Sequence, residues 1–338
     1  MFNFLILLLS LIFIVISSHL FCNALEHLGE KLGVSEGVTG SVFAAVGTAL
    51  PETIIPIIAI LSAHSGVSNH EIGIGAILGA PLMLTTLSLC VMAFSVLKQR
   101  GISGAIMPEP LGVKRDLKFF LFGYGLAFVA VFMQDNHYHM YLNVLLAIIL
   151  GLSYFIYLLL TIKASAALVE DGHNTQASNR LAVAYLGIGT NKLSILIQLI
   201  IASMMLIYFA GMFIDGVNNI AMLYNLSPFI MSLIIIPIAT ELPEKINSVL
   251  WLRNGKDTLA LGNITGAMVF QGTLLPIIGI LFTDWHLVNM LHLSAIIITF
   301  VSTIWVYLLI NKMKVWHFFI NGLLYLVNIG LCLNFFYR

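Results

Sequence analysis

A five-residue phrase occurs twice in this chain, each time inside a long apolar run. Residues 48–52 read Thr-Ala-Leu-Pro-Glu and residues 240–244 read Thr-Glu-Leu-Pro-Glu, so matching positions are 192 residues apart. A carboxylate is costly within a membrane, and a proline interrupts the hydrogen bonds of a helix. An acid beside a broken helix, present in two copies, is typical of secondary transporters, which bind ions through such carbonyls and carboxylates. The repeat therefore predicts an ion transporter.

The composition supports a chain that crosses the membrane many times. Of the 338 residues, 60% are hydrophobic and 9% are charged, against roughly 25% charged residues in an average soluble domain. At about 20 residues per span, the apolar runs predict ten spanning helices. The first run lacks a basic leader and a convincing cleavage site, so we interpret it as a retained helix. The predicted spans are 3–22, 36–63, 72–97, 118–134, 141–163, 193–214, 228–252, 258–282, 290–310 and 315–336.

The connections between the predicted spans differ in their content of lysine and arginine. Those after the odd-numbered spans contain these residues, and those after spans two, four, six and eight contain none. The positive-inside rule places the odd-numbered connections in the cytoplasm and both termini outside. The predicted fold is an all-α polytopic membrane protein of two inverted five-helix repeats, residues 1–165 and 192–338, joined by a cytoplasmic linker over 166–191. A prokaryotic-type inner membrane is the expected location.

The two glutamates of the repeat, Glu52 and Glu244, are expected at similar membrane depth. The adjacent prolines should free backbone oxygens near Thr48 and Thr240, and hard cations bind such oxygens. Two close carboxylates repel each other in a low dielectric unless a cation or a proton binds. These four residues are the predicted cation ligands. The alternative is that each phrase marks only a proline kink whose acid pairs locally.

Three further polar residues are secondary candidates. Glu241 lies four residues before Lys245, the favoured order for a helical ion pair, so it either pairs with that lysine or serves as a third acidic ligand. A self-neutralising pair would leave two net negative charges at the site, which matches one divalent cation. Asn263 and Gln271, in the run after the second phrase, could also contribute ligands.

Residues 37–86 and 227–276 resemble the motifs of the cation/calcium antiporters, which include sodium/calcium exchangers. That family carries a Gly-Thr-Ser-x-Pro-Glu-like phrase in each of two inverted repeats. The resemblance implies ten helices, alternating access, and Glu52 and Glu244 as central ligands. Two departures stand out: Ala49 and Glu241 replace the usual serine, and residues 79–81 and 266–268 read Gly-Ala-Pro and Gly-Ala-Met where the family reads Gly-Ser-Asn. The resemblance therefore supports the fold more strongly than the ion.

The leading hypothesis is secondary antiport of Ca²⁺ against Na⁺ or H⁺. The partners expected are inorganic cations and the lipid bilayer, with no cofactor beyond the transported cations and no enzymatic activity. A net charge of zero gives no case for nucleic acid, and no phosphate-binding loop indicates a nucleotide. The alternatives are a non-transporting assembly or sensing protein, an antiporter for another cation, and a passive channel. Histidines in or near the outside connections, among them His292, are expected to be solvent-exposed.

Overall fold

The described part of the chain is helical. The computed structural model describes residues 2–45, 53, 67–132, 139–170, 174–177, 179–187, 189–223, 237–238, 241–283, 285 and 290–336. Within these ranges there is no β-strand, only two isolated β-bridges. Among the described residues, seven helices are long and apolar enough to span a membrane, by length and composition: Leu8–Leu32, Ile74–Arg100, Met140–Ala166, Lys192–Phe209, Asp257–Phe282, Leu291–Lys312 and Val315–Cys332.

The first half includes two π-helical segments among its described residues. It comprises α1 (Phe2–Leu32), α2 (Glu36–Val38), the π-helix η1 (Thr39–Ala44), the continuous rod of α5 (Val67–Met83), π-helix η3 (Leu84–Ser88) and α6 (Leu89–Arg100), and then α7 (Pro110–Val131) and α8 (His139–Glu170). Pro81 lies inside α5 and has no amide hydrogen, and the turns after it widen into η3. The Thr85 carbonyl in η3 accepts hydrogen bonds from Ser302 Oγ at 2.6 Å and Asn321 Nδ2 at 2.8 Å.

The helix α7 begins at Pro110, earlier than the predicted span start at residue 118. The carboxylate of Glu109 caps it, accepting from the backbone N–H of Leu111 at 2.7 Å and of Gly112 at 2.6 Å. Proline suits the first helical position because its missing N–H has no partner there in any case. The cap and the proline together set this boundary, which apolar character alone did not mark.

The second half follows the same order of long helices. It comprises the 3₁₀-helix η4 (Ala182–Leu186), α9 (Lys192–Leu223), α12 (Leu242–Arg253), α13 (Asp257–Phe282), α14 (Met290–Leu309), the 3₁₀-helix η6 (Ile310–Lys312) and α15 (Val315–Phe336). The helix α8 continues to Glu170, so the segment 166–191 predicted as a linker begins within a helix.

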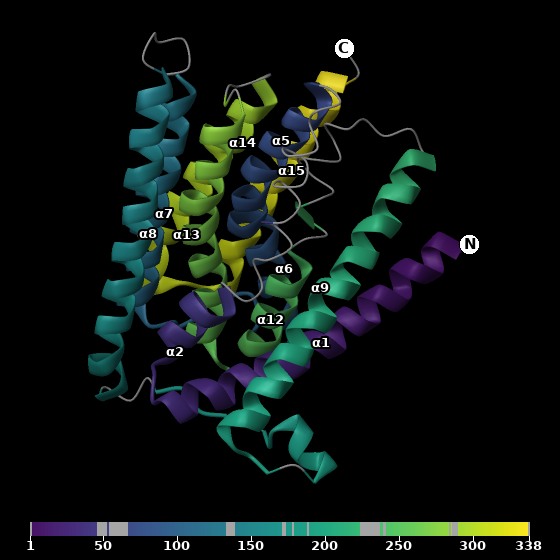
Figure 1. Cartoon of the computed structure of the whole chain (residues 1–338), viewed down its shortest axis with the longest axis vertical. Coiled ribbons are helices and arrows are strands. Elements are labelled where there is room, and N and C mark those ends of the chain that lie inside the picture. Colours follow the sequence, from purple (N-terminus) through teal and green to yellow (C-terminus); the bar gives the residue numbers. More distant parts are fainter. Residues whose placement is uncertain are drawn as a thin grey trace.

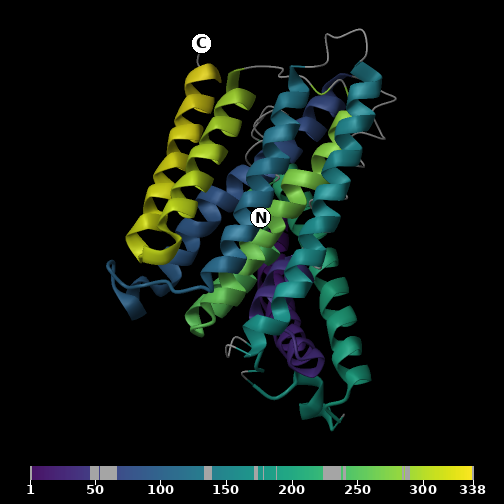
Figure 2. The ribbon, with the colours of Figure 1, turned by 90° about the vertical axis from the view of Figure 1, so that its left-hand side faces the viewer.

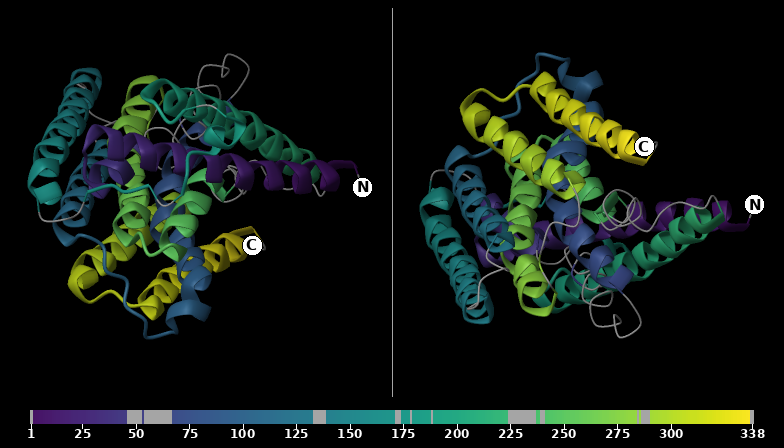
Figure 3. Two further views of the ribbon diagram at one scale, coloured as in Figure 1. Left: turned by 90° about the horizontal axis from the view of Figure 1, so that it is seen from below. Right: turned by 90° about the horizontal axis from the view of Figure 1, so that it is seen from above.

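Helices of the two halves pack against each other reciprocally. Figure 1 shows α1 and α9 side by side and inclined to the upright helices, an arrangement that recurs in both views of Figure 3. The second-half helix α13 packs on α7 and α8, while the first-half rod of α5 and α6 packs on α14 and α15. The pair of α14 and α15 is seen at the left of Figure 2. Each half therefore supplies a central helix that the other half covers.

Small residues allow η1 to lie directly on α13. A Cβ atom added to Gly266 would lie 2.2 Å from the Ser41 carbonyl oxygen, and one added to Gly40 would lie 2.8 Å from the Leu259 carbonyl oxygen. Such distances are too short for any side chain. Glycines at these positions bring the helix backbones into contact, as small-xxx-small patterns do in membranes.

Ion pairs join the two halves where α12 turns into α13. The guanidinium of Arg100, at the end of α6, donates to both carboxylate oxygens of Asp257, at 2.7 and 2.8 Å. It also donates to the Leu252 carbonyl at 2.8 Å. Nearby, Lys256 pairs with Glu26 of α1 at 2.8 Å. The bidentate geometry fixes the end of one central helix to the start of the other.

Candidate functional site

Glu244 lies in the first turn of α12 and is completely buried. The helix begins at Leu242, immediately before the proline of the repeated phrase, with Glu241 as its N-cap residue. Proline at the start of a helix costs no hydrogen bond, because the first N–H groups have no intrahelical acceptor. The positive end of the helix dipole favours a carboxylate in this turn, or a cation-carboxylate pair held by it. The sequence phrase therefore places an acid at a buried helix start.

Asn263 of α13 fixes the turn that carries Glu244. Its amide nitrogen donates to the Glu244 carbonyl oxygen at 3.1 Å and to Ser248 Oγ at 2.9 Å. Its side-chain oxygen makes no hydrogen bond within the described residues. Asn263 thus holds the backbone of the acid's own turn and keeps one buried oxygen available.

Glu241 forms the ion pair that its spacing from Lys245 indicated. Lys245 Nζ lies 3.1 Å from Glu241 Oε2, and the side chains of Lys245 and Glu241 are 6% and 0% exposed. The second oxygen, Oε1, has no hydrogen bond within the described residues. The pair is electrically neutral as a unit, so Glu244 supplies the net negative charge of this helix start.

Gln271 and Tyr325 extend the polar cluster to α13 and α15. The Gln271 amide faces the Glu241 carboxylate, although within the described residues it completes no hydrogen bond of good geometry. The Tyr325 hydroxyl is also within electrostatic range of Glu241. Both side chains are buried, at 0% and 4% exposed. Three helices therefore direct polar groups at one acidic helix start.

The predicted ligands from the other repeat lie outside the described residues. Thr48 and Glu52 fall there, as does Thr240 of the second repeat. Of the predicted set, the structure brings together Glu244, Glu241, Asn263 and Gln271 around the start of α12 and on the adjacent face of α13. Ala267 and Met268, which stand in place of the family's serine and asparagine, are buried, and their side chains contain no oxygen atom.

Asp116 is a buried acid that the sequence reasoning missed. It is 0% exposed, and its Oδ2 accepts from Ser41 Oγ at 2.7 Å and from Thr265 Oγ1 at 2.6 Å. In the sequence it stands between Arg115 and Lys118, where a charge is expected in a solvated connection. The sequence feature that could have indicated its burial is the apolar run that begins at residue 119.

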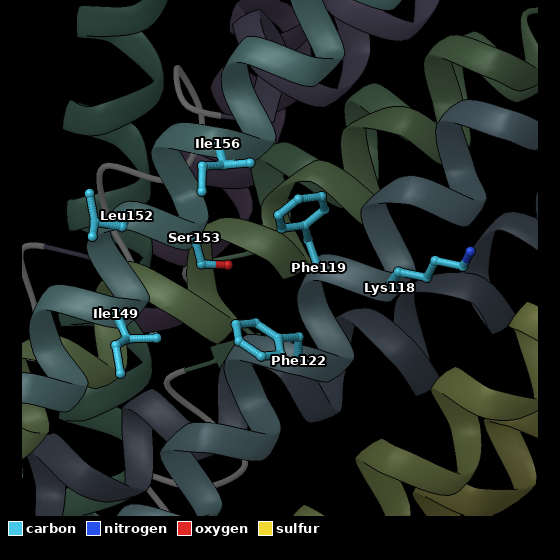
Figure 4. A pocket seen from close by; sticks show the side chains of 7 residues that line it. All are labelled: Lys118, Phe119, Phe122, Ile149, Leu152, Ser153 and Ile156. Carbon is cyan, nitrogen blue, oxygen red and sulfur yellow. The ribbon is translucent and has the colours of Figure 1, made fainter.

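An apolar pocket lies apart from these groups. A pocket of about 400 Å³ opens between α7 and α8, as Figure 4 shows. Its lining is apolar apart from the Ser153 hydroxyl and the Lys118 amine, whose charge repels a cation. We therefore do not assign it as the cation site. The lining residues are Lys118, Phe119, Phe122, Ile149, Leu152, Ser153 and Ile156.

His292 differs from its expected exposure. It lies in α14 and is 0% exposed. The helix starts at Met290, as the predicted span does, and His292 lies within it close to the connection, but its side chain is buried and not exposed. The structure assigns His292 to the core.

Long apolar helices around a buried, acidic helix start are typical of membrane transport proteins. Comparison with known proteins identifies the family of this chain. The model of the sodium/calcium exchanger protein family matches residues 2–163 and 194–334. The chain belongs to this family of membrane antiporters, which are transporters and not enzymes. Each matched segment contains one copy of the Thr-x-Leu-Pro-Glu phrase.

Individual relatives agree with this assignment. The sodium/calcium exchanger MaX1 of Methanosarcina acetivorans is 38% identical over 89 residues, which is 25% of each chain. The inner membrane protein YrbG of Escherichia coli is 24% identical over 278 residues, covering 79% of this chain and 75% of its own. A solved structure of the sodium-calcium exchanger NCX_Mj superposes with a TM-score of 0.71 at 21% identity, covering 98% of both chains. At that identity the superposition shows the fold.

Proposed function

We propose that this chain is a secondary active antiporter that exchanges Ca²⁺ for Na⁺ or H⁺ at one site near the membrane midplane. Glu244 and Glu52 bind the cation, and oxygens of Thr48 and Thr240 complete the site. The observation that carries the proposal is Glu244, wholly buried at the start of α12 with its turn held by Asn263. Family membership and the second copy of the phrase support it.

The charge balance supports a divalent ion. Glu241 and Lys245 neutralise each other, so Glu244 and Glu52 together present two negative charges. One Ca²⁺, two Na⁺ or two protons each cancel that charge. Competition of these ions for two carboxylates gives exchange. The change between the inward-open and outward-open states is favourable only when a bound cation or protons neutralise the two carboxylates, because uncompensated charges are costly in the apolar interior.

The architecture proposed for this mechanism is ten spanning helices in two inverted repeats, with both termini outside. The reciprocal packing of α13 and of the α5–α6 rod supports it, as does the spacing of α1 and α9, which begin at residues 2 and 192. Inverted repeats place equivalent broken helices at the same depth from opposite sides. We further propose a prokaryotic inner membrane as its location, since one of the relatives is the inner membrane protein YrbG.

The test is uptake of ⁴⁵Ca²⁺ into proteoliposomes under an imposed Na⁺ gradient and, separately, a pH gradient. Wild type is expected to accumulate Ca²⁺ under one of them, which names the counter-ion. Glu244→Gln and Glu52→Gln should abolish uptake, because each removes one of the two charges. Glu170→Gln, which changes an exposed acid at the end of α8, is the matched control and should transport normally.

Two results would overturn the proposal. Full uptake by both glutamine variants would remove Glu244 and Glu52 from the site. Absence of flux for Ca²⁺ and for other cations under either gradient would favour a non-transporting role in assembly or sensing, for which the oxygen-free side chains of Ala267 and Met268 are the supporting observation.

A further inference from the structure

Asp116 lies where four structural elements meet. This junction is separate from the acidic start of α12. We propose that its carboxyl group is a proton-binding site whose occupancy is coupled to the packing of η1 on α13. The coupling to transport rests on the function proposed above, whereas the proton site does not. The junction comprises Asp116 on α7, Ser41 on η1, Thr265 on α13 and Tyr157 on α8.

The hydroxyl of Thr265 allows the junction to accommodate both protonation states. Thr265 Oγ1 lies 2.6 Å from Asp116 Oδ2 and 3.0 Å from the Leu261 carbonyl oxygen, and it has one hydrogen to donate. When Asp116 is ionised, Thr265 donates to the carboxylate. When Asp116 is protonated, its O–H donates to Thr265, which turns its hydrogen to Leu261. No heavy atom has to move for this exchange of hydrogen bonds, so neither state leaves a buried donor without an acceptor.

A second oxygen of the carboxyl group remains available. Asp116 Oδ1 is buried and has no hydrogen bond within the described residues. The Tyr157 hydroxyl lies beside the carboxyl group and 3.4 Å from the Ser41 carbonyl oxygen. An ionised carboxylate here is stabilised by the hydroxyl groups of Ser41, Thr265 and Tyr157, and a bound proton removes its charge from the apolar interior.

The reciprocal junction in the other half is built without a charge. There the Thr85 carbonyl of η3 accepts from Ser302 of α14 and Asn321 of α15. Neutral groups therefore suffice to hold a central helix against the pair that covers it. A carboxyl group at Asp116 adds a capacity that packing alone does not require, namely exchange of a proton.

The packing around Ser41 suits a proton better than a metal ion. The Ser41 carbonyl oxygen is so close to α13 that a Cβ on Gly266 would lie 2.2 Å from it. A cavity that touches Thr265 has a volume of about 10 Å³, which is room for about one water molecule. A single carboxylate also balances a single positive charge.

Charged and titratable groups around Asp116 come from every element that packs on α7. Arg115 of α7 acts directly on the carboxylate, and Tyr157 of α8 acts on it from the other side, with Tyr154 one turn away. The charged group of α13, Asp257, is bound to Arg100. The remaining titratable groups on α14 and η6 are His292, Tyr307 and Lys312.

The junction is linked to both repeated phrases, to one along the chain and to the other through α13. Along the chain, η1 leads to Thr48 and Glu52, and Thr265 lies two residues beyond Asn263, which holds the Glu244 carbonyl. Asp116 Oδ2 links these two elements, because it accepts hydrogen bonds from Ser41 of η1 and from Thr265 of α13. Protonation reverses the bond with Thr265 and removes the charge that strengthens the bond from Ser41. The two protonation states therefore hold η1 against α13 with different strengths, which is the differential interaction that coupling needs.

The direct test is infrared spectroscopy of the protein labelled with ¹³C-aspartate, in lipid, between about pH 5 and about pH 9. Wild type should show a protonated carboxyl band that titrates and is lost in Asp116→Asn, which keeps the shape and cannot exchange a proton. Thr265→Val and Ser41→Ala remove one donor each to the ionised form and should move the midpoint to higher pH. Because these two variants keep the carboxyl group, they test the proposal even if Asp116→Asn does not fold.

Two infrared outcomes overturn the site. One is a titrating band that persists in Asp116→Asn, and the other is a midpoint that neither Thr265→Val nor Ser41→Ala moves. The coupling is tested separately by the pH profile of ⁴⁵Ca²⁺ uptake, which should vary about tenfold across the two pH units around the midpoint in wild type and flatten in Asp116→Asn. An unchanged profile rejects the coupling, whereas loss of all flux in wild type rejects the proposed function and leaves the proton site standing on the infrared result.

Discussion

The ion pair between Glu241 and Lys245 makes a quantitative prediction. Its charges are 3.1 Å apart and nearly inaccessible to water. At an effective dielectric constant of about 20, their attraction is about 5 kcal/mol. Removal of one partner leaves a buried charge without its counter-charge, which costs about 3–5 kcal/mol. Lys245→Met and Glu241→Gln should each lower the free energy of unfolding by that amount.

The double variant separates pairing from any other role. When both charges are removed, neither residue leaves an uncompensated ion, so Glu241→Gln with Lys245→Met should be more stable than either single variant by about 2 kcal/mol or more. The assay is reversible unfolding by SDS in lipid bicelles, followed by tryptophan fluorescence. Lys118→Met is the matched control, because Lys118 has no ion pair within the described residues. Additive losses in the double variant, or a coupling below about 1 kcal/mol as in exposed pairs, would show that the two charges do not stabilise each other in the folded protein.

Two further predictions concern the packing between halves. Gly266→Ala should sharply reduce the yield of folded protein, because its Cβ would lie 2.2 Å from the Ser41 carbonyl oxygen; Gly125→Ala, which meets nothing within 4 Å, is the control, and equal yields by size-exclusion chromatography would contradict the packing. Arg100→Lys should lower the melting temperature nearly as much as Arg100→Gln, since lysine cannot reproduce the two parallel bonds to Asp257; full stability of the lysine variant would show that charge alone suffices.

The site was partly predictable because several of its features depend only on residues that are close together in the sequence. The spacing of Glu241 and Lys245 indicated the ion pair, and the proline of the second phrase indicated a kink near Thr240, where the structure has α12 begin at Leu242. A break in backbone hydrogen bonding and an i,i+4 contact both depend on neighbouring residues only. Glu244 was selected for the same reason, since an acid in an apolar run stands out.

Other features depend on contacts between distant segments. Asp116 is flanked by basic residues, and only the packing of Ser41 and Thr265 around it makes it a buried acid. His292 was expected at the surface because it lies next to a connection, yet its side chain is completely buried. Similarly, the Thr85 carbonyl in the widened turns of η3 accepts hydrogen bonds from α14 and α15. No local sequence pattern specifies these contacts.

The most direct test of the central claim is exchange of ⁴⁵Ca²⁺ for unlabelled Ca²⁺ across proteoliposomes at equal concentrations and without any other gradient. This measurement reports binding and alternating access at the carboxylate site independently of the counter-ion. We expect rapid exchange by wild type and by Glu170→Gln, and none by Glu244→Gln or Glu52→Gln. Exchange at the wild-type rate in both of the latter variants would contradict the central claim.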